Sequence, residues 1–334
     1  AAYISPRPRE SKVKIPISAG NRSASIKAMI VAILTLTLLI PVQMIKGVVF
    51  DRQGNESIAI ADIQGSWGGE QTIVGPVLKL PYRVEKSTVY GLSYADEKVV
   101  YMLAKELRAH ADVAAEERYR GMHKIPVFNA TVKAGVRFDF ALLDSLGITD
   151  EQVQWPDAEV YLGISDPTAI SKIPLLVADG AEVEFTASTE SIDGLPSELR
   201  APLDEQLDKP PPERELEVTV SLSLNGSGSL SFLPLADNAA VTMSGNWNSP
   251  SFTGRQLPAD REIRDDGFDA SWSSTRIGRK LPSAWIGRHD QPPSIGQGAF
   301  GARFIQPVGL YQVIERSTKY AVLIIGLTFV AYFL

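Results

Sequence analysis

Apolar residues gather in two long runs, one near each end of the chain. The first run, residues 28–45, reads AMIVAILTLTLLIPVQMI, eighteen positions without a charge, and residues 47–50 can extend it. A helix needs about 20 apolar residues to cross a hydrocarbon layer of about 30 Å. The pattern therefore predicts a transmembrane helix over residues 28–48. A cleaved signal peptide is the alternative, but the sequence up to Asp51 offers no small-residue cleavage site.

The second run, Tyr320 to Leu334, reads YAVLIIGLTFVAYFL and follows Arg316 and Lys319. As a helix its fifteen residues would rise only about 22 Å, which is less than a full crossing. We therefore expect residues 319–334 to begin a second transmembrane helix, and the natural chain to continue beyond them. A C-terminal strand or a core helix is the alternative.

Between the two runs, residues 51–318 alternate apolar and polar positions with period two. The alternating segments are rich in β-branched and aromatic residues and are separated by Gly, Pro, Asn and Asp, as antiparallel strands are. The clearest segments lie at 130–140, 158–164, 181–187, 216–224, 229–233, 239–243 and 268–272. The pattern predicts a mainly β domain, sandwich-like and antiparallel with one or two helices, tethered by transmembrane helices.

Helical spacing predicts one helix inside this domain, over residues 96–118. Val99, Leu103 and Leu107 recur there at intervals of four, which places them on one face of a helix. A second, acidic helix is expected over residues 196–207.

A proline-rich segment, residues 208–214 (DKPPPER), divides the domain into halves. Consecutive prolines favour a stiff polyproline connector. The two halves, 51–207 and 215–318, show a weak similarity in the order of their strands and turns, so we expect two tandem β subdomains. Alternating β sequences also produce such similarity by chance, which leaves the alternative of unrelated halves open.

Charge is distributed unevenly along the chain, and this sets an expected orientation. Residues 1–27 carry six basic side chains and one acidic one, whereas the whole chain has a net charge of −6. Basic residues beside a first span stay in the cytoplasm. We therefore expect a membrane protein with a basic cytoplasmic tail, residues 1–27, and a main domain on the outer side of the membrane. The acidity of that domain argues against nucleic acid as a partner.

The sequence offers no recognisable catalytic or metal-binding pattern. It has no cysteine, which excludes thiol catalysis and zinc-thiolate or iron–sulfur sites, and its three histidines are His110, His123 and His289. None belongs to an HExxH motif, and no G-x-S-x-G elbow is present. We interpret Gly65–Gly69 as a turn that lets Trp67 pack. We therefore predict that the protein is not an enzyme and that it binds no cofactor and no metal.

An aromatic-rich region is the strongest candidate for a contact surface. Trp247 and Phe252 stand near Arg255 and Arg261, and the region ends at Trp272. Aromatic side chains bury large areas, so packing in the core is one interpretation. Exposed aromatic residues beside arginines would instead suit an interface with a partner protein. These five residues are the predicted partner contacts.

Several motifs resemble the CreD family of inner-membrane proteins. They are VGPVLKLPY at 74–82, RYRGMHKIPVFNATVKAGVRF at 118–138, SGNWNSPSFTGRQLPADREIRDDGFDASW at 244–272 and LYQVIERSTKYAVLIIGLTFVAYF at 310–333. The resemblance implies a cell-envelope integrity protein produced in response to cell-wall stress, with an N-terminal helix, a large periplasmic domain and further C-terminal spans. It implies no catalytic residues. Residues 1–27 form a longer basic extension than the resemblance leads us to expect.

Three hypotheses about function follow. The first is a non-enzymatic envelope protein, in contact with membrane lipids, whose β domain binds another envelope component, above all a protein. The alternative is an accessory or assembly subunit of a larger inner-membrane complex, respiratory or transport, since small residues in both apolar runs would allow close helix packing. The third is a lipid carrier with a cavity between its sheets, or an envelope hydrolase, for which His289, Asp260 and Asp290 are the residues to test.

Overall fold

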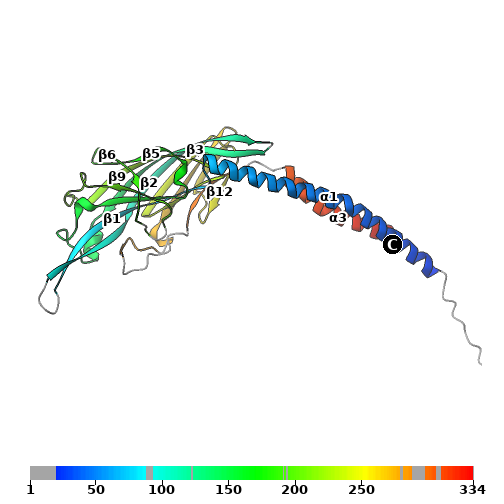
Figure 1. Ribbon diagram of the computed structural model, residues 1–334, viewed down its shortest axis with the longest axis horizontal. Helices are drawn as coiled ribbons and strands as arrows, with labels where there is room; N and C mark the ends of the chain where they lie inside the picture. Colours follow the sequence, from blue (N-terminus) through cyan, green and yellow to red (C-terminus); the bar gives the residue numbers. More distant parts are fainter. Residues whose placement is uncertain are drawn as a thin grey trace, which may run out of the picture. The chain divides into compact units, whose positions relative to one another are not determined.

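The computed structural model describes residues 20–87, 93–121, 123–190, 192, 195–278, 281–287, 298–305 and 310–333. These residues belong to two compact units (Figure 1). The first unit holds helix α3 and the part of helix α1 up to Asn55. The second unit, Glu56–Pro307, holds the end of α1 and all the described strands.

Helix α1 spans Gly20–Trp67 and contains the predicted membrane segment. Apolar side chains along it, such as Leu36 and Met44, are exposed. Among the described residues, α1 is the helix with the length and composition needed to cross a membrane. A helix suits lipid because its backbone hydrogen bonds are satisfied within the segment. The predicted helix over residues 28–48 is confirmed.

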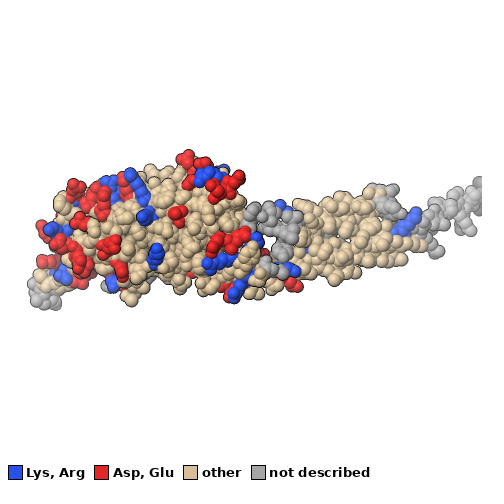
Figure 2. Space-filling model, turned by 90° about the horizontal axis from the view of Figure 1, so that it is seen from above, with Lys and Arg blue, Asp and Glu red and all other residues tan. Residues whose placement is uncertain are grey.

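The helix at the other end of the chain, α3, spans Leu310–Phe333 and so begins before the expected boundary at residue 319. The helical prediction for this segment is confirmed, and its crossing of a membrane stays a prediction. Figure 2 shows charged side chains spread over the β domain and few of them along the described helices.

The second unit is a sandwich of two sheets, which we name A and B. Sheet A runs in the order β12–β16–β10–β1–β4–β8–β7, and the first part of β2 pairs with both β1 and β15. Its strands are β1 (Gln71–Ser87), β2 (Ser93–Arg120), β4 (Glu159–Ile164), β7 (Thr186–Ala187), β8 (Glu198–Pro202), β10 (Ser229–Pro234), β12 (Pro250–Gly254), β15 (Ala284–Ile286) and β16 (Phe300–Phe304).

Sheet B runs in the order β6–β5–β9–β3–β2–β11–β14–β13. Its other strands are β3 (His123–Asp139), β5 (Ile170–Ala178), β6 (Ala181–Glu184), β9 (Glu215–Ser227), β11 (Ala236–Gly245), β13 (Asp260–Arg264) and β14 (Gly267–Thr275). Short helices α2 (Ala141–Ser145), η1 (Trp155–Asp157), η2 (Pro167–Ala169) and η3 (Arg276–Gly278) connect them. Leu162 and Phe232 of sheet A face Val132 and Val220 of sheet B across the core.

Strand β2 belongs to both sheets, because its first part pairs with β1 and its second part with β3. The chain also crosses from sheet A to sheet B between the consecutive strands β10 and β11. Each runs parallel to its neighbour, β10 to β1 and β11 to β2. The expected β-rich domain is confirmed, but these two pairs depart from the expected antiparallel arrangement.

The helix expected over residues 96–118 is wrong, because these residues lie within strand β2. From Leu107 onward its side chains alternate: Leu107, Ala109 and Ala111 are buried, whereas Arg108 and His110 are exposed. Alanine and leucine favour helices intrinsically. Pairing with β3 on one side and β11 on the other overrides that preference, since it buries the apolar face of the strand.

The acidic helix expected over residues 196–207 is also wrong, because strand β8 and turns occupy that range. The boundary expected at residues 208–214 does not divide the structure. Strand β9, which follows it, pairs with β3 and β5 from before it, and residues 56–307 form one compact unit. Two tandem subdomains are therefore not present; the proline-rich segment is a surface loop of a single domain.

The β domain had been expected to begin at residue 51. Residues 51–67 instead continue helix α1, and its last turns pack against the strands. Ala59 and Ile63 pack with Ile125 and Val127 of β3. The turn expected at Gly65–Gly69 begins only at Gly68, because the helix continues to Trp67. Gly68 has a φ of +119°, which favours glycine, and a Cβ added there would lie 2.6 Å from the Cβ of Ala169.

Candidate binding groove

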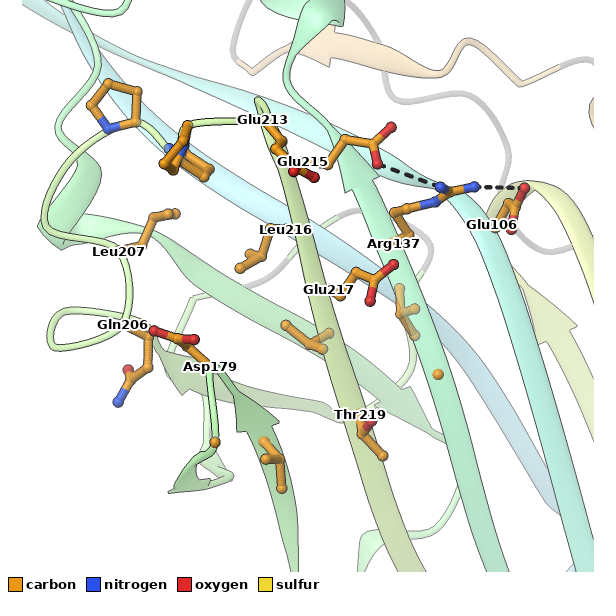
Figure 3. Close-up of a pocket in the computed structure, with 18 of the residues that line it drawn as sticks. Glu106, Arg137, Asp179, Gln206, Leu207, Glu213, Glu215, Leu216, Glu217 and Thr219 are labelled. Carbon is orange, nitrogen blue, oxygen red and sulfur yellow. Dashed lines mark hydrogen bonds and ion pairs between the residues drawn. The ribbon is translucent and has the colours of Figure 1, made fainter.

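An open groove lies on the outer face of sheet B. It has a volume of about 1180 Å³. Its floor is formed by β3 and β9, and one wall by the loop 205–213, which contains the three consecutive prolines. Figure 3 shows this loop facing β9 across the groove. We call this feature the proline-loop groove.

The floor of the proline-loop groove follows from the period-two pattern of β9. Leu216, Val218 and Val220 are buried in the sandwich core, so Glu217 and Thr219 project outward. Gly135 of β3 lies beside Thr219 in the sheet, and nothing lies within 4 Å of where its Cβ would be. The floor is therefore flat and open at Gly135.

The groove is predominantly acidic. Seven carboxylates line it, against the cations Arg108, Arg137 and Lys209. Arg137 lies 2.7 Å from Glu106 and 3.4 Å from Glu215, so it neutralises part of the floor (Figure 3). The other five carboxylates have no ion-pair partner among the described residues. They are Asp179, Glu205, Asp208, Glu213 and Glu217.

A lysine at the end of the groove stabilises the same face of the sheet. Lys105 contacts Asp139 at 2.8 Å and Glu215 at 2.9 Å. The hydrogen bond from Lys105 lowers the pKa of Asp139, and the hydrogen bond to Asp139 raises the pKa of Lys105. Both groups therefore stay charged over a wide pH range.

Arg214 anchors the end of the proline-loop wall. Its guanidinium donates to Asp144 and Asp150, each at 3.0 Å, and to the carbonyl of Phe140 at 3.2 Å. A planar guanidinium that binds three acceptors fixes its own orientation. With Pro210–Pro212 limiting backbone freedom, the wall is held in place before any ligand binds.

The five predicted partner contacts do not form one exposed aromatic surface, because the three aromatic side chains pack into the domain. Trp272 is only 2% exposed, and Phe252 packs against it with ring centroids 5.8 Å apart. Trp247 is half-buried and donates to the carbonyl of Ile305 at 3.2 Å. Packing therefore accounts for these three aromatic side chains. Arg255 and Arg261 are exposed, and their contact with a partner stays a prediction.

A buried charged cluster in sheet A was missed in the sequence. Lys79 is 7% exposed, contacts Glu159 at 3.0 Å, and also binds Glu190; Arg200 pairs with Glu159 from the other side. Burial disfavours the charge on Lys79, but its hydrogen bonds to both glutamates outweigh burial and raise its pKa. Burial raises the pKa of neighbouring Tyr161 to about 12. A lysine between two leucines inside VGPVLKLPY was the available signal.

Glu159 shows the same balance from the acidic side. Its burial favours the protonated form, but the hydrogen bonds from Lys79, Arg200 and Tyr161 outweigh burial and lower the pKa of Glu159. Each charged group of this cluster has an opposite charge beside it. We therefore assign the cluster to stability and not to ligand binding.

Of the three residues named for the hydrolase hypothesis, Asp260 alone lies within the described parts of the chain. His110 lies 2.9 Å from the hydroxyl of Thr242 and shares a shallow depression with Asp260. His123 begins β3, and His289 and Asp290 lie outside the described residues. Among the described residues no group of three or more His, Asp or Glu has the geometry to hold a metal ion.

The lipid-carrier hypothesis requires a cavity between the sheets. The apolar cavity found there, between Leu162, Phe232, Val132 and Val220, measures about 30 Å³. On this measure a cavity needs about 10–15 Å³ to hold one water molecule, so this one has room for roughly two. This cavity cannot hold an acyl chain.

Comparisons with known proteins agree with the membrane helix. A family model described as "Inner membrane protein CreD" matches residues 23–334. Inner membrane protein CreD of Escherichia coli (strain K12) is 29% identical over 309 residues, which are 89% of this chain and 65% of that protein. The chain thus spans 65% of the length of this relative.

Solved structures give much weaker likenesses. An M1 zinc metallopeptidase of Deinococcus radiodurans is 10% identical, with a TM-score of 0.24, over 59% of this chain and 41% of that one. A mutant of that enzyme is 8% identical, with a TM-score of 0.26, over 59% and 42%. Scores this low carry no argument about fold or activity. On the match to residues 23–334 and the similarity to the Escherichia coli protein, the chain belongs to the CreD family of inner membrane proteins.

Proposed function

We propose that this protein is a non-enzymatic binding protein of the cell envelope, which presents its β domain (Gln71–Phe304) in the periplasm and keeps its N-terminus in the cytoplasm. The six basic side chains of residues 1–27, which precede the apolar run, support this orientation, because positive charge beside a span is retained in the cytoplasm. An envelope-integrity role belongs to the same proposal.

The orientation can be tested because the chain has no cysteine. A single Ala181→Cys in β6 should react with a membrane-impermeant thiol reagent in intact spheroplasts. A Ser11→Cys in the basic tail should react only after lysis. The reverse pattern would contradict the proposed orientation.

The observation that carries the proposed binding function is the set of five carboxylates without ion-pair partners in the proline-loop groove. Like charges held together on a fixed surface repel one another, and a cationic ligand relieves that repulsion. The flat floor at Gly135 leaves room for an extended backbone. We therefore assign to the groove an extended, basic segment of another envelope protein.

Site-specific photo-crosslinking of the full-length protein in its own membrane tests this assignment. A photoreactive side chain at Thr219, on the groove floor, should crosslink to a defined protein partner. The same side chain at Thr242, which is exposed on β11, serves as the matched control. Equal crosslinking at both positions, or none at Thr219, would contradict binding in the groove.

Charge neutralisation provides a second test. The double variant Asp179→Asn with Glu217→Gln should lower the crosslinking yield at Thr219 several-fold. The control variant Asp260→Asn with Glu262→Gln changes the same number of exposed acids on β13 and should leave the yield unchanged. Cells that lack the protein should tolerate cell-wall inhibitors poorly, and the groove variant should fail to restore tolerance.

The accessory-subunit hypothesis predicts a different outcome. Native electrophoresis in mild detergent would then show the protein in a fixed ratio with defined subunits, whatever the charge of the groove. Loss of the partner from the neutralised groove variant favours the groove proposal, and retention favours the subunit hypothesis.

A further inference from the structure

Charge is divided unevenly across the proline-loop groove. The five carboxylates that have no ion-pair partner among the described residues lie on the loop, on β9 and at the turn between β5 and β6. Arg108 borders the groove from β2, two strands away from β9. Neighbouring strands are about 4.8 Å apart, so this cation lies about 10 Å across the sheet from β9. The groove therefore has an acidic side and a cationic side.

The two smallest types of residue flank Arg108 in the sheet. Gly135 of β3 lies opposite Arg108 on one side, and Ala240 of β11 lies opposite it on the other. The side chain of Arg108 is 81% exposed, and its contact with Glu106 is 3.7 Å long. Glu106 lies closer to Arg137, at 2.7 Å. The guanidinium of Arg108 is therefore held only weakly and is open to an anion from outside the domain.

A second cation lies diagonally beside Arg108. Lys133 of β3 is opposite His110, which follows Arg108 by two residues and projects from the same outer face. Diagonal neighbours of this kind are about 7–8 Å apart, a distance that two long side chains can span. Lys133 is exposed and forms no ion pair with another described residue, Asp112 on the adjacent strand included. One carboxylate can therefore contact both Arg108 and Lys133.

We infer that the segment bound in the groove carries a carboxylate about three residues away from its basic side chains, and that Arg108 and Lys133 bind this carboxylate. The inference rests on the binding function proposed above for the groove. An extended chain advances about 3.3 Å per residue, so three residues cover the distance of about 10 Å from the acidic side to the cationic side. Arginine and lysine bind carboxylates through charge-assisted hydrogen bonds.

The two cations give the groove specificity for a pattern of charge. A segment with a basic side chain over Arg108 and Lys133 would bring like charges together, which lowers its affinity. A segment whose charges are separated into a basic part and an acidic part matches both sides of the groove. The partner class is therefore an extended segment with separated charges.

Fluorescence anisotropy tests this specificity with labelled octapeptides and the full-length protein in phosphatidylcholine nanodiscs. The peptide KTKTETET has separated charges, and KTETKTET has the same composition and net charge with mixed charges. The wild type should bind KTKTETET several-fold more tightly than KTETKTET. Equal affinities for the two peptides would overturn the inference without the use of any variant.

Variants assign the preference to the two cations. Arg108→Gln with Lys133→Gln should abolish the preference for KTKTETET and should not weaken the binding of KTKTQTQT, a peptide without acids. The control, Arg83→Gln with Lys86→Gln, removes two exposed cations of β1 and should keep the preference. A preference that persists without Arg108 and Lys133 would overturn the role given to these residues.

A failure of this inference differs from a failure of the groove proposal. Binding of KTKTQTQT that is lost in Asp179→Asn with Glu217→Gln would support the groove, and equal affinities for the two isomeric peptides would then overturn the inference alone. If the wild type bound neither KTKTQTQT nor KTKTETET, the groove proposal and the inference that rests on it would both be wrong.

Discussion

The guanidinium of Arg118 lies over the indole ring of Trp67, 3.5 Å from its centroid. This contact joins the end of α1 to the strand that takes part in both sheets, β2. The end of α1 is thereby held against the β domain in part by this stacked pair, and the loss of the pair should be measurable.

Replacement of Trp67 by alanine should lower the free energy of unfolding of the β domain by about 2 kcal/mol. The variant loses a half-buried aromatic side chain and its cation–π contact. Unfolding by urea in mild detergent, followed by near-ultraviolet circular dichroism, measures the change. Tyr119→Ala, at an exposed neighbouring position, is the control and should stay within about 0.5 kcal/mol of the wild type. Equal effects would contradict the role given to Trp67.

Removal of Lys79 should destabilise the domain more strongly. In Lys79→Ala the carboxylate of Glu159, with a side chain only 13% exposed, retains Arg200 but loses its closest buried cation. Breaking a buried pair from one side costs about 3 kcal/mol. Arg83→Ala removes an exposed pair with Glu97 and is the matched control, with an expected loss below about 1 kcal/mol.

The same cluster predicts how stability depends on pH. The folded-state pKa of Glu159 lies below its ordinary value of 4.5, so its stabilising contribution is complete above that pH and is lost as the pH falls through the lowered pKa. In Lys79→Met the main cause of the lowering is removed. This variant should therefore lose less additional stability than the wild type between pH 5 and pH 3, a range set around the values typical of carboxyl groups, about 4. Parallel pH profiles would exclude the coupling.

Replacement of Arg214 should loosen the wall of the proline-loop groove. Arg214→Ala removes the contacts to Asp144, Asp150 and the carbonyl of Phe140, so hydrogen exchange in residues 205–213 should become faster. Arg214→Lys keeps the charge but loses the fork geometry, and should give an intermediate rate. Unchanged exchange in Arg214→Ala would show that the prolines alone hold the loop.

Substitutions in the aromatic region should fall into two groups by their effect on the free energy of unfolding, large at core positions and small at surface positions. Trp272→Ala removes a fully buried ring and should cost about 3–5 kcal/mol of folding free energy. Arg255→Ala changes an exposed side chain and should cost less than about 0.5 kcal/mol. Thermal unfolding measures both. If Arg255→Ala nevertheless lowered crosslinking to a partner, the predicted contact at Arg255 would be supported.

The sequence by itself determined the elements whose formation depends on near neighbours. The apolar run at 28–45 predicts a membrane helix because a segment that crosses hydrocarbon must be predominantly apolar. Period-two alternation located the strands around residues 130–140 and 216–224, since one face of a sheet is buried and the other is wet. The motifs at 74–82, 118–138, 244–272 and 310–333 together indicated the CreD family, and the family match agrees.

Tertiary structure decided everything that depends on which segments meet. Residues 96–118 have a helical repeat at Val99, Leu103 and Leu107, yet pairing with β3 and β11 makes them a strand. Trp272 and Phe252 could have formed a surface, and only the packing of the two sheets shows them to be core. The proline-loop groove combines residues as distant as Glu106 and Glu217, and no local pattern can reveal a cavity assembled by long-range strand pairing.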